Sequence, residues 1–489
     1  MKLDELLAPW VSSSMPTIEI TSLSNDSRTI EPGALFLAYP GHSTDGRKFI
    51  PHAFEKGASA LVYEQNNFPA DIELPEKLIC IPVTGLAQHT AHIAARFYGY
   101  KEKSLNLTGV TGTNGKTTIA WLLSQAFNLL GEPAAYIGTL GQGIKDKIYP
   151  LPNTTPDALC LHKLFADFQH QNIQRVAMEV SSHALDQGRV SGLRFKQAIF
   201  TNLTHDHLDY HRTFEAYAQA KSKLFMVDGL EQAIINLDDP YAGKMLAAVQ
   251  SGCEVVTYGF HSNADVRALD LTMDERGVFA NIESPWGKFS LQLSLIGQFN
   301  LYNALAVFST LVSSGYKAET VVKVLSQLQA APGRMEIITH QPLIVVDFAH
   351  SPDALKNVLS TLKQLKKGRL LLVFGCGGER DHEKRPLMGK VAGEFADEIF
   401  VTSDNPRNED PDKILDEIIS GINSQKGFYR ISDRKEAIHR AIESAKEEDT
   451  VLIAGKGHEA YQIIGNKTFA FSDQAIAREL LRNRTIVQE

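Results

Sequence analysis

Three glycines, a lysine and two threonines stand close together at the start of the second hundred residues. The sequence LNLTGVTGTNGKTT occupies residues 105–118, with glycines at positions 109, 112 and 115. Glycines allow backbone N–H groups to curl around an anion, and a helix that begins there directs the positive end of its dipole at the same anion. We therefore expect a phosphate-binding loop in which Lys116 reaches the β- and γ-phosphates of a nucleotide and the Thr117 hydroxyl ligates Mg²⁺.

The residues on either side of the glycines support this interpretation. Apolar residues at Leu105, Leu107 and Val110 predict a short buried strand. Apolar residues then recur with helical spacing between positions 119 and 130 and predict an amphipathic helix. The general pattern G-x-x-x-x-G-K-[ST] is not fully matched, because Val110 stands where its first glycine would be. A plain glycine turn that binds nothing is the alternative.

Acidic and imidazole side chains follow two further predicted strands. RVAMEV at 175–180 is typical of a buried strand, and Glu179 lies at its carboxyl end, where a carboxylate beside a phosphate loop commonly holds Mg²⁺. A strand at 199–203 leads into a segment with five potential ligands: His205, Asp206, His207, Asp209 and His211. We expect further Mg²⁺ ligands among them. A zinc site is the alternative, although no cysteine or H-E-x-x-H pattern accompanies them.

The overall composition is that of a globular protein and narrows the possible functions. The 489 residues are 43% hydrophobic and 22% charged, and a domain size of about 150 residues suggests three domains. A net charge of −8 argues against nucleic acid as a partner. The four cysteines are far apart, as in a reduced cytoplasmic protein. We see no signal peptide and no apolar run of about 18 residues, so we expect a cytoplasmic protein without membrane insertion.

The order of the predicted elements divides the chain into three α/β domains. Residues 1–103 form a small N-terminal α/β domain, and 104–334 form a central P-loop ATPase-like domain with a parallel sheet. After the Pro-Gly break, strands and helices alternate through 335–489, which predicts a Rossmann-like C-terminal domain. Ligands bind such sheets beyond the carboxyl ends of the strands. Four polar clusters are expected there: 347–350, 377–381, 404–407 and 455–459.

A set of motifs in all three regions resembles the Mur ligases of peptidoglycan synthesis. The central motifs are GVTGTNGKTT, NTTPD at 153–157, MEVSSHALDQGRV at 178–190, NLTHDHLDYH at 202–211, AKSKLF at 220–225 and GQFNLYNALA at 297–306. The C-terminal motifs are GCGGERDHEKRPLMG at 375–389, DNPR at 404–407 and GKGHE at 455–459. Within this family, the motifs of this sequence are similar to those of the ligases that add the third residue of the peptide.

The resemblance implies an ATP-dependent amide ligase of cell wall biogenesis that works through an acyl phosphate. Its substrates would be UDP-N-acetylmuramoyl-L-alanyl-D-glutamate and meso-2,6-diaminopimelate, and its cofactors ATP and two Mg²⁺ ions. Phosphoryl transfer depends on positioning and charge neutralisation, which suits this set of cofactors. The implied catalytic residues are Lys116, Glu179, His207 and Lys221. Thr117 and Glu179 would hold one ion, and His207 with a carbamylated Lys221 the other. Without the resemblance, Lys221 is more typical of an ordinary helix-surface lysine.

The resemblance also assigns three binding sites. The ATP site consists of Gly112, Thr113, Asn114, Gly115, Lys116, Thr117, Thr118, Asn303, Arg334 and Asp347. The site for the UDP-sugar dipeptide consists of Ser27, His42, Ser43, Thr44, Asn153, Thr154, Thr155, Ser181, Gln187 and Arg189. The diaminopimelate site consists of Arg380, Asp404, Asn405, Pro406, Arg407, Gly455 and Glu459. Taken alone, the polar loop residues of the first region are more typical of solvated turns.

The identity of the amine depends on the DNPR motif. Arg407 can grip the distal carboxylate of diaminopimelate with two parallel hydrogen bonds, and L-lysine lacks that carboxylate. The same ligation with L-lysine is the nearest alternative, and a ligase like folylpolyglutamate synthase is a more distant one. A P-loop switch or motor and a non-enzymatic nucleotide-binding module are further alternatives. Neither of them would require Glu179, His207 and Lys221 together as metal ligands. We expect a monomer whose domains close around small-molecule substrates.

Overall fold

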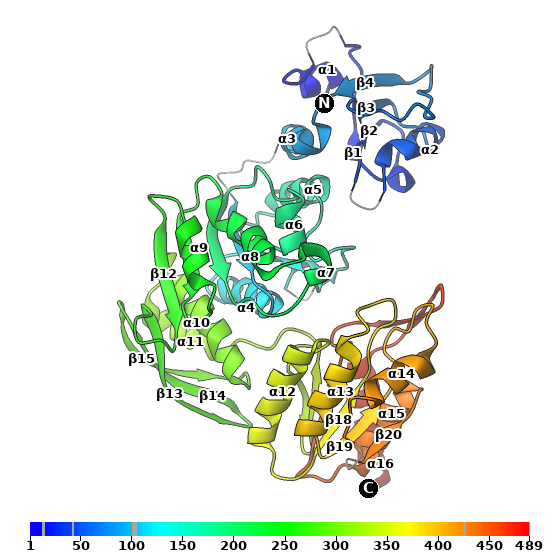
Figure 1. Ribbon diagram of the computed structural model, residues 1–489. Coiled ribbons are helices and arrows are strands. Elements are labelled where there is room, and N and C mark those ends of the chain that lie inside the picture. Colours follow the sequence, from blue (N-terminus) through cyan, green and yellow to red (C-terminus); the bar gives the residue numbers. More distant parts are fainter. Residues whose placement is uncertain (12–14, 42–43, 100–104, 146, 424–426, 489) are drawn as a thin grey trace.

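Three α/β bodies follow one another along the chain in the computed structural model, which describes residues 1–11, 15–41, 44–99, 105–145, 147–423 and 427–488. Figure 1 shows a blue N-terminal body, a cyan-to-green central body and a yellow-to-red C-terminal body. Their main sheets have four, eleven and six strands. The predicted fold class, three α/β domains with largely parallel sheets, is therefore confirmed.

The N-terminal body is built on four parallel strands in the order β1-β2-β3-β4. Strand β2 has the sequence ALFLA and is buried along its whole length, because its alternate residues enter apolar clusters on opposite faces of the sheet. The strands are β1 (Ser22–Ser24), β2 (Ala34–Ala38), β3 (Ala60–Glu64) and β4 (Ile79–Val83). The helices are α1 (Leu3–Leu7), η1 (Ser27–Thr29), η2 (Gly46–Phe49), α2 (Ile50–Glu55) and α3 (Leu86–Tyr98).

The central sheet has the strand order β15-β14-β13-β12-β11-β10-β5-β9-β6-β7-β8. Its middle is parallel from β6 to β13, so the carboxyl ends of β5, β9 and β10 lie side by side at one edge. The strand predicted at 199–203 starts earlier and ends at Phe200. The strands are β5 (Asn106–Thr111), β6 (Ala134–Gly138), β7 (Gly141–Ile144), β8 (Lys147–Tyr149), β9 (Arg175–Glu179), β10 (Phe195–Phe200), β11 (Gln232–Asn236), β12 (Glu254–Gly259), β13 (Val266–Asp274), β14 (Gly277–Ser284) and β15 (Gly287–Leu293).

Helices cover both faces of the central sheet, because the buried residues of its strands feed two separate apolar clusters. Helix α4 begins at Lys116, directly after the glycine-rich loop, as the helical spacing predicts. Helix α10 contains both Asn300 and Asn303 in its first turns. The helices are α4 (Lys116–Leu129), α5 (Ala158–His170), α6 (Ser182–Asp186), α7 (Leu208–His211), α8 (Phe214–Ser222), η4 (Lys223–Met226), α9 (Ala242–Ala248), α10 (Gln298–Ser313) and α11 (Ala318–Leu325).

The C-terminal sheet has the order β16-β17-β21-β18-β19-β20, in which only the pairing of β16 with β17 is antiparallel. A separate hairpin, β22 with β23, follows the last of these strands. The strands are β16 (Glu336–His340), β17 (Leu343–Asp347), β18 (Leu370–Phe374), β19 (Glu398–Val401), β20 (Phe428–Arg430), β21 (Thr450–Ala454), β22 (Tyr461–Ile464) and β23 (Lys467–Ala470). The helices are α12 (Pro352–Leu365), α13 (Lys384–Phe395), α14 (Pro411–Ile419), α15 (Arg434–Ser444) and α16 (Asp473–Gln488).

The junctions between the bodies fall near the predicted domain boundaries. Helix α3 of the N-terminal body packs on α5 of the central body, and Leu159 of α5 joins the N-terminal apolar cluster. The predicted break after residue 103 lies outside the described residues, and the break after residue 334 falls between α11 and β16. The exact boundary positions stay a prediction.

Candidate active site

The loop between β5 and α4 is held in place by the segment that follows β10. The Thr113 N–H donates to the Asn202 carbonyl at 2.8 Å, and the Asn114 N–H donates to the Asn202 side chain at 2.9 Å. Glycine is needed at Gly112, where φ is +149° and a Cβ atom would lie 1.8 Å from Thr201 Oγ1. Contacts within the protein therefore fix the shape of this loop.

Two lysine side chains converge on the loop. Lys116 Nζ donates to the Gly112 and Thr113 carbonyls at 2.9 and 2.8 Å, and Lys221 Nζ donates to the Gly112 carbonyl at 2.7 Å. Lys221 also lies 4.4 Å from the centre of the Tyr217 ring. Desolvation lowers the pKa of both ammonium groups, and that of Lys221 falls well below its usual value. The Lys221 side chain is 1% exposed, which excludes an ordinary surface lysine.

Glu179 is fully buried at the carboxyl end of β9, and its carboxylate accepts four hydrogen bonds. Its Oε1 accepts from the Tyr136 hydroxyl at 2.6 Å and the Thr139 N–H at 2.7 Å. Its Oε2 accepts from Thr117 Oγ1 at 2.9 Å and Thr139 Oγ1 at 3.2 Å. A Cβ atom at Gly138 would lie 2.2 Å from Oε1. Thr117 and Glu179, which the sequence predicts to share an ion, are thus in direct contact.

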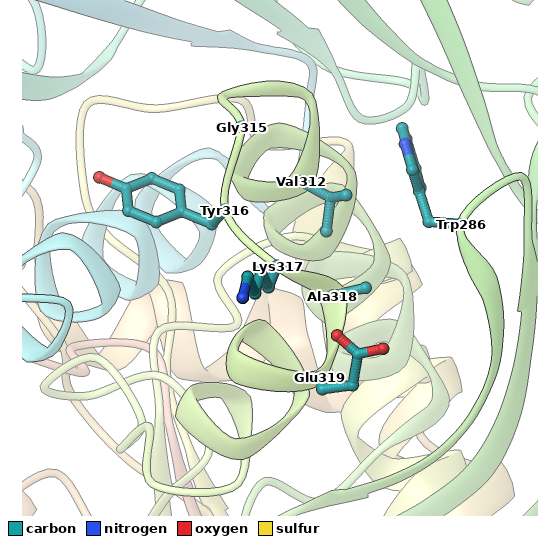
Figure 2. A pocket seen from close by; sticks show the side chains of 7 residues that line it. All are labelled: Trp286, Val312, Gly315, Tyr316, Lys317, Ala318 and Glu319. Carbon is teal, nitrogen blue, oxygen red and sulfur yellow. The ribbon is translucent and has the colours of Figure 1, made fainter.

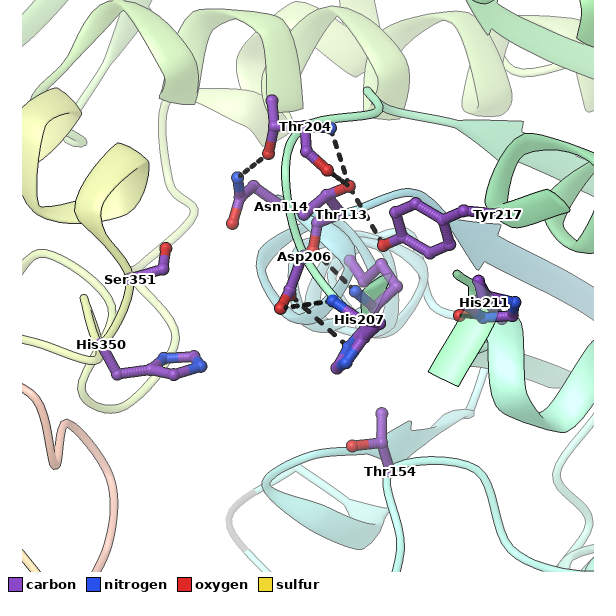
Figure 3. Close-up of polar contacts among 12 residues, drawn as sticks. Thr113, Asn114, Thr154, Thr204, Asp206, His207, His211, Tyr217, His350 and Ser351 are labelled. Carbon is purple, nitrogen blue, oxygen red and sulfur yellow. Dashed lines mark hydrogen bonds and ion pairs between the residues drawn. The ribbon is translucent and has the colours of Figure 1, made fainter. Parts of the chain in front are cut away.

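His207 lies beside the phosphate loop. Figure 3 shows it with Asp206 next to Thr113 and Asn114, while His350 of the C-terminal body points toward them. The His207 N–H donates to Asp206 Oδ1 at 3.0 Å, and its ring Nε2 is 3.5 Å from Asp206 Oδ2. Desolvation and the nearby ammonium of Lys116 outweigh Asp206 and lower the pKa of His207 to about 4. The imidazole is therefore neutral near pH 7, which is the form that binds metal ions.

Arg334 and Asn303 reach the same loop from outside it. Arg334 Nη2 donates to Thr117 Oγ1 at 3.3 Å, and its guanidinium lies 4.4 Å from the centre of the Phe348 ring. A Cβ atom at Gly115 would lie 2.7 Å from Asn303 Oδ1, so Asn303 lies directly against the glycine that precedes α4. Both predicted nucleotide residues therefore adjoin the phosphate loop.

Asp347 is committed to backbone contacts at the start of the C-terminal body. Its two carboxylate oxygens accept from the Met335 and Ala349 N–H groups, both at 2.8 Å. Burial raises the pKa of Asp347, and the positive charge of Arg334 opposes that shift. The carboxylate of Asp347 therefore holds the backbone at Met335, directly after Arg334, in place.

The UDP-sugar residues predicted in the central body form one hydrogen-bonded strip. Thr155 Oγ1 donates to the Glu179 carbonyl at 2.9 Å and accepts from the Ser181 N–H at 3.0 Å. Arg189 Nη1 donates to the Thr155 carbonyl at 2.9 Å, and its Nη2 donates to Gln187 Oε1 at 2.6 Å. This strip connects directly to the strand that ends in Glu179.

Two predicted residues on the neighbouring loop extend this strip. Thr154 Oγ1 lies 3.1 Å from Thr139 Oγ1, beside the Glu179 carboxylate, and Asn153 is exposed.

In the N-terminal body, Ser27 is buried with its Oγ 2.9 Å from His52 Nδ1, which makes a solvated turn the wrong interpretation for this residue. Thr44 is exposed, and His42 and Ser43 lie outside the described residues.

Tyr39 follows strand β2 in the N-terminal body. Its hydroxyl accepts from Asn25 Nδ2 at 3.2 Å. Burial raises the pKa of Tyr39, while Asp157 raises it further and Arg189 lowers it, so both charged groups lie within electrostatic range. The sequence prediction missed Tyr39, because a tyrosine at the end of a buried strand is typical of an ordinary core residue.

The predicted amine-site residues lie on loops that follow three adjacent strands, β21, β18 and β19. Asn405 Nδ2 donates to Glu459 Oε2 at 2.8 Å. A Cβ atom at Gly455 would lie 2.8 Å from Asp404 Oδ2, and φ at this glycine is +114°. Pro406 is buried beside them. The structure therefore brings these five residues together.

Arg407 and Arg380 lie on the neighbouring side of this pocket. The Arg407 N–H donates to the Ile463 carbonyl at 3.1 Å, and its Nη1 donates to the Gly378 carbonyl at 2.6 Å. A Cβ atom at Gly377 would lie 3.1 Å from Arg407 Nη1 and 3.7 Å from Arg380 Cγ. Arg407 has φ +53°, an uncommon backbone conformation for a residue with a side chain.

The residues around the loop fit a magnesium nucleotide. Thr117 and Glu179 offer the hydroxyl and carboxylate oxygens that Mg²⁺ prefers, and Lys116 and Arg334 supply positive charge for phosphates. Within the described residues, Arg334 Nε is buried without a hydrogen-bond partner, as expected for a donor that serves a ligand. The described part of the chain holds no group of three or more His, Cys, Asp or Glu side chains placed for a metal.

A surface cavity in the central body lies elsewhere. It has a volume of about 320 Å³ and is lined by Trp286, the end of α10 and the start of α11, as Figure 2 shows. None of its seven lining residues belongs to a predicted site. We therefore do not assign substrate binding to it.

Models of a single protein family match all three bodies. The family's catalytic domain matches residues 19–98, its middle domain residues 110–311 and its glutamate ligase domain residues 333–457. The chain therefore belongs to the Mur ligase family. The three matches follow one another in chain order and together cover most of the chain.

Individual relatives of this Mur ligase match it almost from end to end. The UDP-N-acetylmuramoyl-L-alanyl-D-glutamate–2,6-diaminopimelate ligase of Pseudomonas syringae is 45% identical over 93% of each chain. The enzyme of that name from Chromobacterium violaceum is 42% identical over 95% of this chain and 94% of its own length. A solved structure titled with the same name superposes with a TM-score of 0.71 at 35% identity, over 99% of both chains.

Several contacts of this Mur ligase went unpredicted, although the sequence contains signals for some of them. Tyr217 precedes Lys221 by four residues on α8, which places both on one helical face. The ring of His183, in the MEVSSHALD motif, lies 4.9 Å from that of His207. Thr139 follows β6 and gave no signal, because its role depends on the pairing of β6 with β9. None of the described helices combines the length and apolar character needed to cross a membrane.

Proposed function

We propose that this Mur ligase joins meso-2,6-diaminopimelate to UDP-N-acetylmuramoyl-L-alanyl-D-glutamate, with hydrolysis of ATP to ADP and phosphate, in the cytoplasm and as a monomer. The observation that carries the reaction is the near full-length match to relatives with that name, at 42–45% identity. The match includes the loops of the phosphate site and of the amine pocket. The residues of both sites suit the chemistry.

The first step activates the substrate carboxylate, which is otherwise a poor acyl donor. A carboxylate oxygen attacks the γ-phosphorus of ATP, the bond to the β-phosphate oxygen breaks, and an acyl phosphate and ADP result. Lys116, the loop N–H groups and Arg334 hold the phosphate oxygens in line and offset their charge. Bound Mg²⁺ would supply further neutralisation of the phosphate charge. The amine then attacks the acyl carbon, and phosphate leaves.

The proposed ion ligands follow from the same contacts. Thr117 and Glu179 would hold one Mg²⁺ through their oxygens, which already lie 2.9 Å apart. His207 and Lys221 would serve a second ion, with Lys221 carbamylated: its amine adds to CO₂, loses a proton and becomes an anionic oxygen ligand. The buried position of Lys221 beside Lys116 supports this proposal, since a carbamate would replace a second positive charge with a negative one.

The two organic substrates are assigned to two separate sets of residues. We propose that the UDP-sugar dipeptide binds the ten residues that the sequence predicts for it: Ser27, His42, Ser43, Thr44, Asn153, Thr154, Thr155, Ser181, Gln187 and Arg189. The packing of α3 on α5, with Leu159 in the N-terminal apolar cluster, supports a site shared by the N-terminal and central bodies. We propose that diaminopimelate binds at Arg380, Asp404, Asn405, Pro406, Arg407, Gly455 and Glu459, with Arg407 on its distal carboxylate.

Phosphate release tests the proposal directly. The full chain is assayed with ATP, Mg²⁺ and the UDP-sugar dipeptide, and with either meso-diaminopimelate or L-lysine as amine. We expect turnover with diaminopimelate and little with lysine. Turnover with lysine would keep the ligase and overturn the assignment of Arg407. Turnover with neither amine would overturn the proposed substrates, and a pteroyl-glutamate acceptor would then test the ligase that resembles folylpolyglutamate synthase.

A further inference from the structure

A buried lysine outside the predicted binding sets lies beneath the amine pocket. Lys456 follows β21 in the GKGHE motif, and its side chain is fully buried. Its Nζ donates to Asn405 Oδ1 at 3.1 Å and to Glu459 Oε2 at 3.0 Å. It also lies 5.6 Å from the centre of the Tyr461 ring. Burial of an ammonium group costs free energy unless partner groups compensate its charge. The contacts with Asn405 and Glu459 supply that compensation for Lys456.

The contacts of Lys456 determine which way the Asn405 amide points. Asn405 Oδ1 accepts from Lys456 Nζ and from the Ile463 N–H at 3.0 Å, and both of these groups can only donate. The amide oxygen must therefore face Lys456, and the NH₂ group must face Glu459, to which it donates at 2.8 Å. A flipped amide would bring its own N–H groups against two donors.

The same ammonium acts on the Glu459 carboxylate. Glu459 Oε2 accepts from both Lys456 and Asn405, which anchors one of its two oxygens. Lys456 and Glu459 thereby form an ion pair in which the lysine side chain is fully buried and the glutamate side chain is 18% exposed. One anchored oxygen fixes the direction of the other, which is the geometry that recognition of an ammonium group requires.

We infer that Lys456 is a positioning residue for the amine substrate: it fixes Asn405 and Glu459 in the orientation that receives diaminopimelate. This inference rests on the function proposed above, because it gives a role to the residue beneath that pocket. Lys456 does not touch the substrate in this account. It acts through two side chains that do.

The experiment measures steady-state phosphate release by the full chain while the concentration of diaminopimelate or of ATP is varied. The variants are Lys456→Met, which keeps the volume but removes the donors, and Lys456→Gln, which keeps N–H donors but removes the charge. Lys467→Met, at an exposed position of β23, is the matched control. Thermal unfolding of each variant is recorded beside the kinetics.

We expect Lys456→Met to raise the KM for diaminopimelate by about 100-fold and Lys456→Gln by about 10-fold, because hydrogen bonds to charged groups are worth that range. The KM of both Lys456 variants for ATP should equal that of the wild type. The Lys467→Met control should keep the wild-type KM for both substrates. A role in packing alone predicts the reverse order, since Met fills a buried site better than Gln. If Lys456→Met does not fold, Lys456→Gln decides by itself, and an unchanged KM for the amine would overturn the inference.

The wild-type assay separates this inference from the proposed function. A wild-type chain that releases no phosphate with diaminopimelate overturns the proposed function. A wild-type chain that turns over, with variants whose KM values for diaminopimelate and ATP rise equally, overturns only the role of Lys456.

Discussion

The phosphate site and the amine pocket present their positive charges in different ways. At the phosphate loop, the ammonium groups of Lys116 and Lys221 donate to backbone carbonyls. In the amine pocket, Lys456 is paired with the carboxylate of Glu459 and the amide of Asn405. A nucleotide brings several negative charges, whereas diaminopimelate brings charges of both signs. Under the proposed assignments, the first site would select by total charge, and the second by the arrangement of paired groups.

The two sites also differ in how they are assembled. The phosphate loop joins one strand to the helix that follows it, and nearby strand ends brace it. The amine pocket is formed by the loops that follow β21, β18 and β19. The β22–β23 hairpin packs against these loops and contacts both Asn405 and Arg407. Four substitutions, in order of decreasing effect, test this comparison.

Lys221→Ala should have the largest effect, because it would remove the proposed carbamate ligand of the second Mg²⁺ ion. We expect a loss of phosphate release of about 10³-fold or more, comparable to the loss of a key electrostatic group. Added short-chain carboxylate should restore part of the activity by supplying the missing anion. Lys196→Ala, on the surface of the same body, is the control. Full activity of the Lys221 variant would contradict the carbamate proposal.

Arg407→Ala should affect only the amine pocket. We expect the KM for diaminopimelate to rise by about 100- to 1,000-fold, since a carboxylate would lose its bidentate partner. Binding of ATP, measured by calorimetry, should not change, because Arg407 contacts Gly378 and not the phosphate loop. Arg430→Ala, which removes a surface ion pair with Asp416, serves as the control. An unchanged KM would remove Arg407 from the amine site.

Gly138→Ala tests how closely the phosphate site is packed. The new methyl group would lie 2.2 Å from Glu179 Oε1 and 2.3 Å from the Tyr136 hydroxyl. We expect a loss of about 1–3 kcal/mol in the free energy of unfolding, measured with urea, together with reduced turnover. Gly243→Ala is the matched control, because nothing lies within 4 Å of its Cβ position in helix α9. Equal free energies of unfolding for the two variants would show that the groups around the Glu179 carboxylate can move to make room for the methyl group.

Tyr217→Phe should have the smallest effect. The ring that faces Lys221 remains, and only the hydroxyl that lies 3.1 Å from Thr113 Oγ1 is lost. One neutral hydrogen bond corresponds to a rise of about 2- to 10-fold in the KM for ATP. Tyr149→Phe, at an exposed position, should have no effect. A loss of catalysis as large as that of Lys221→Ala would mean that the Tyr217 hydroxyl takes part in the reaction.

The sequence was most informative where the chemistry is contiguous. The pattern around Lys116 predicted a strand, a glycine turn and a helix, and the structure contains them in that order, because glycine spacing and helix starts act over a few residues. The alternation of strands and helices predicted the C-terminal sheet and the edge at which its polar loops gather. The edge strands β16 and β20 were not predicted, since their burial patterns are weak.

Contacts between distant segments required the tertiary structure. The Thr139 side chain reaches Glu179 only because β6 pairs with β9, and Leu159 joins the N-terminal apolar cluster only because α5 packs on α3. Lys456 belongs to a motif that the sequence singled out, yet nothing in its local pattern indicates that Asn405 lies above it. Residue types and spacing thus determined the chemical groups and their order. Strand pairing and domain packing decided which groups meet, because burial and hydrogen bonding depend on neighbours from the whole chain.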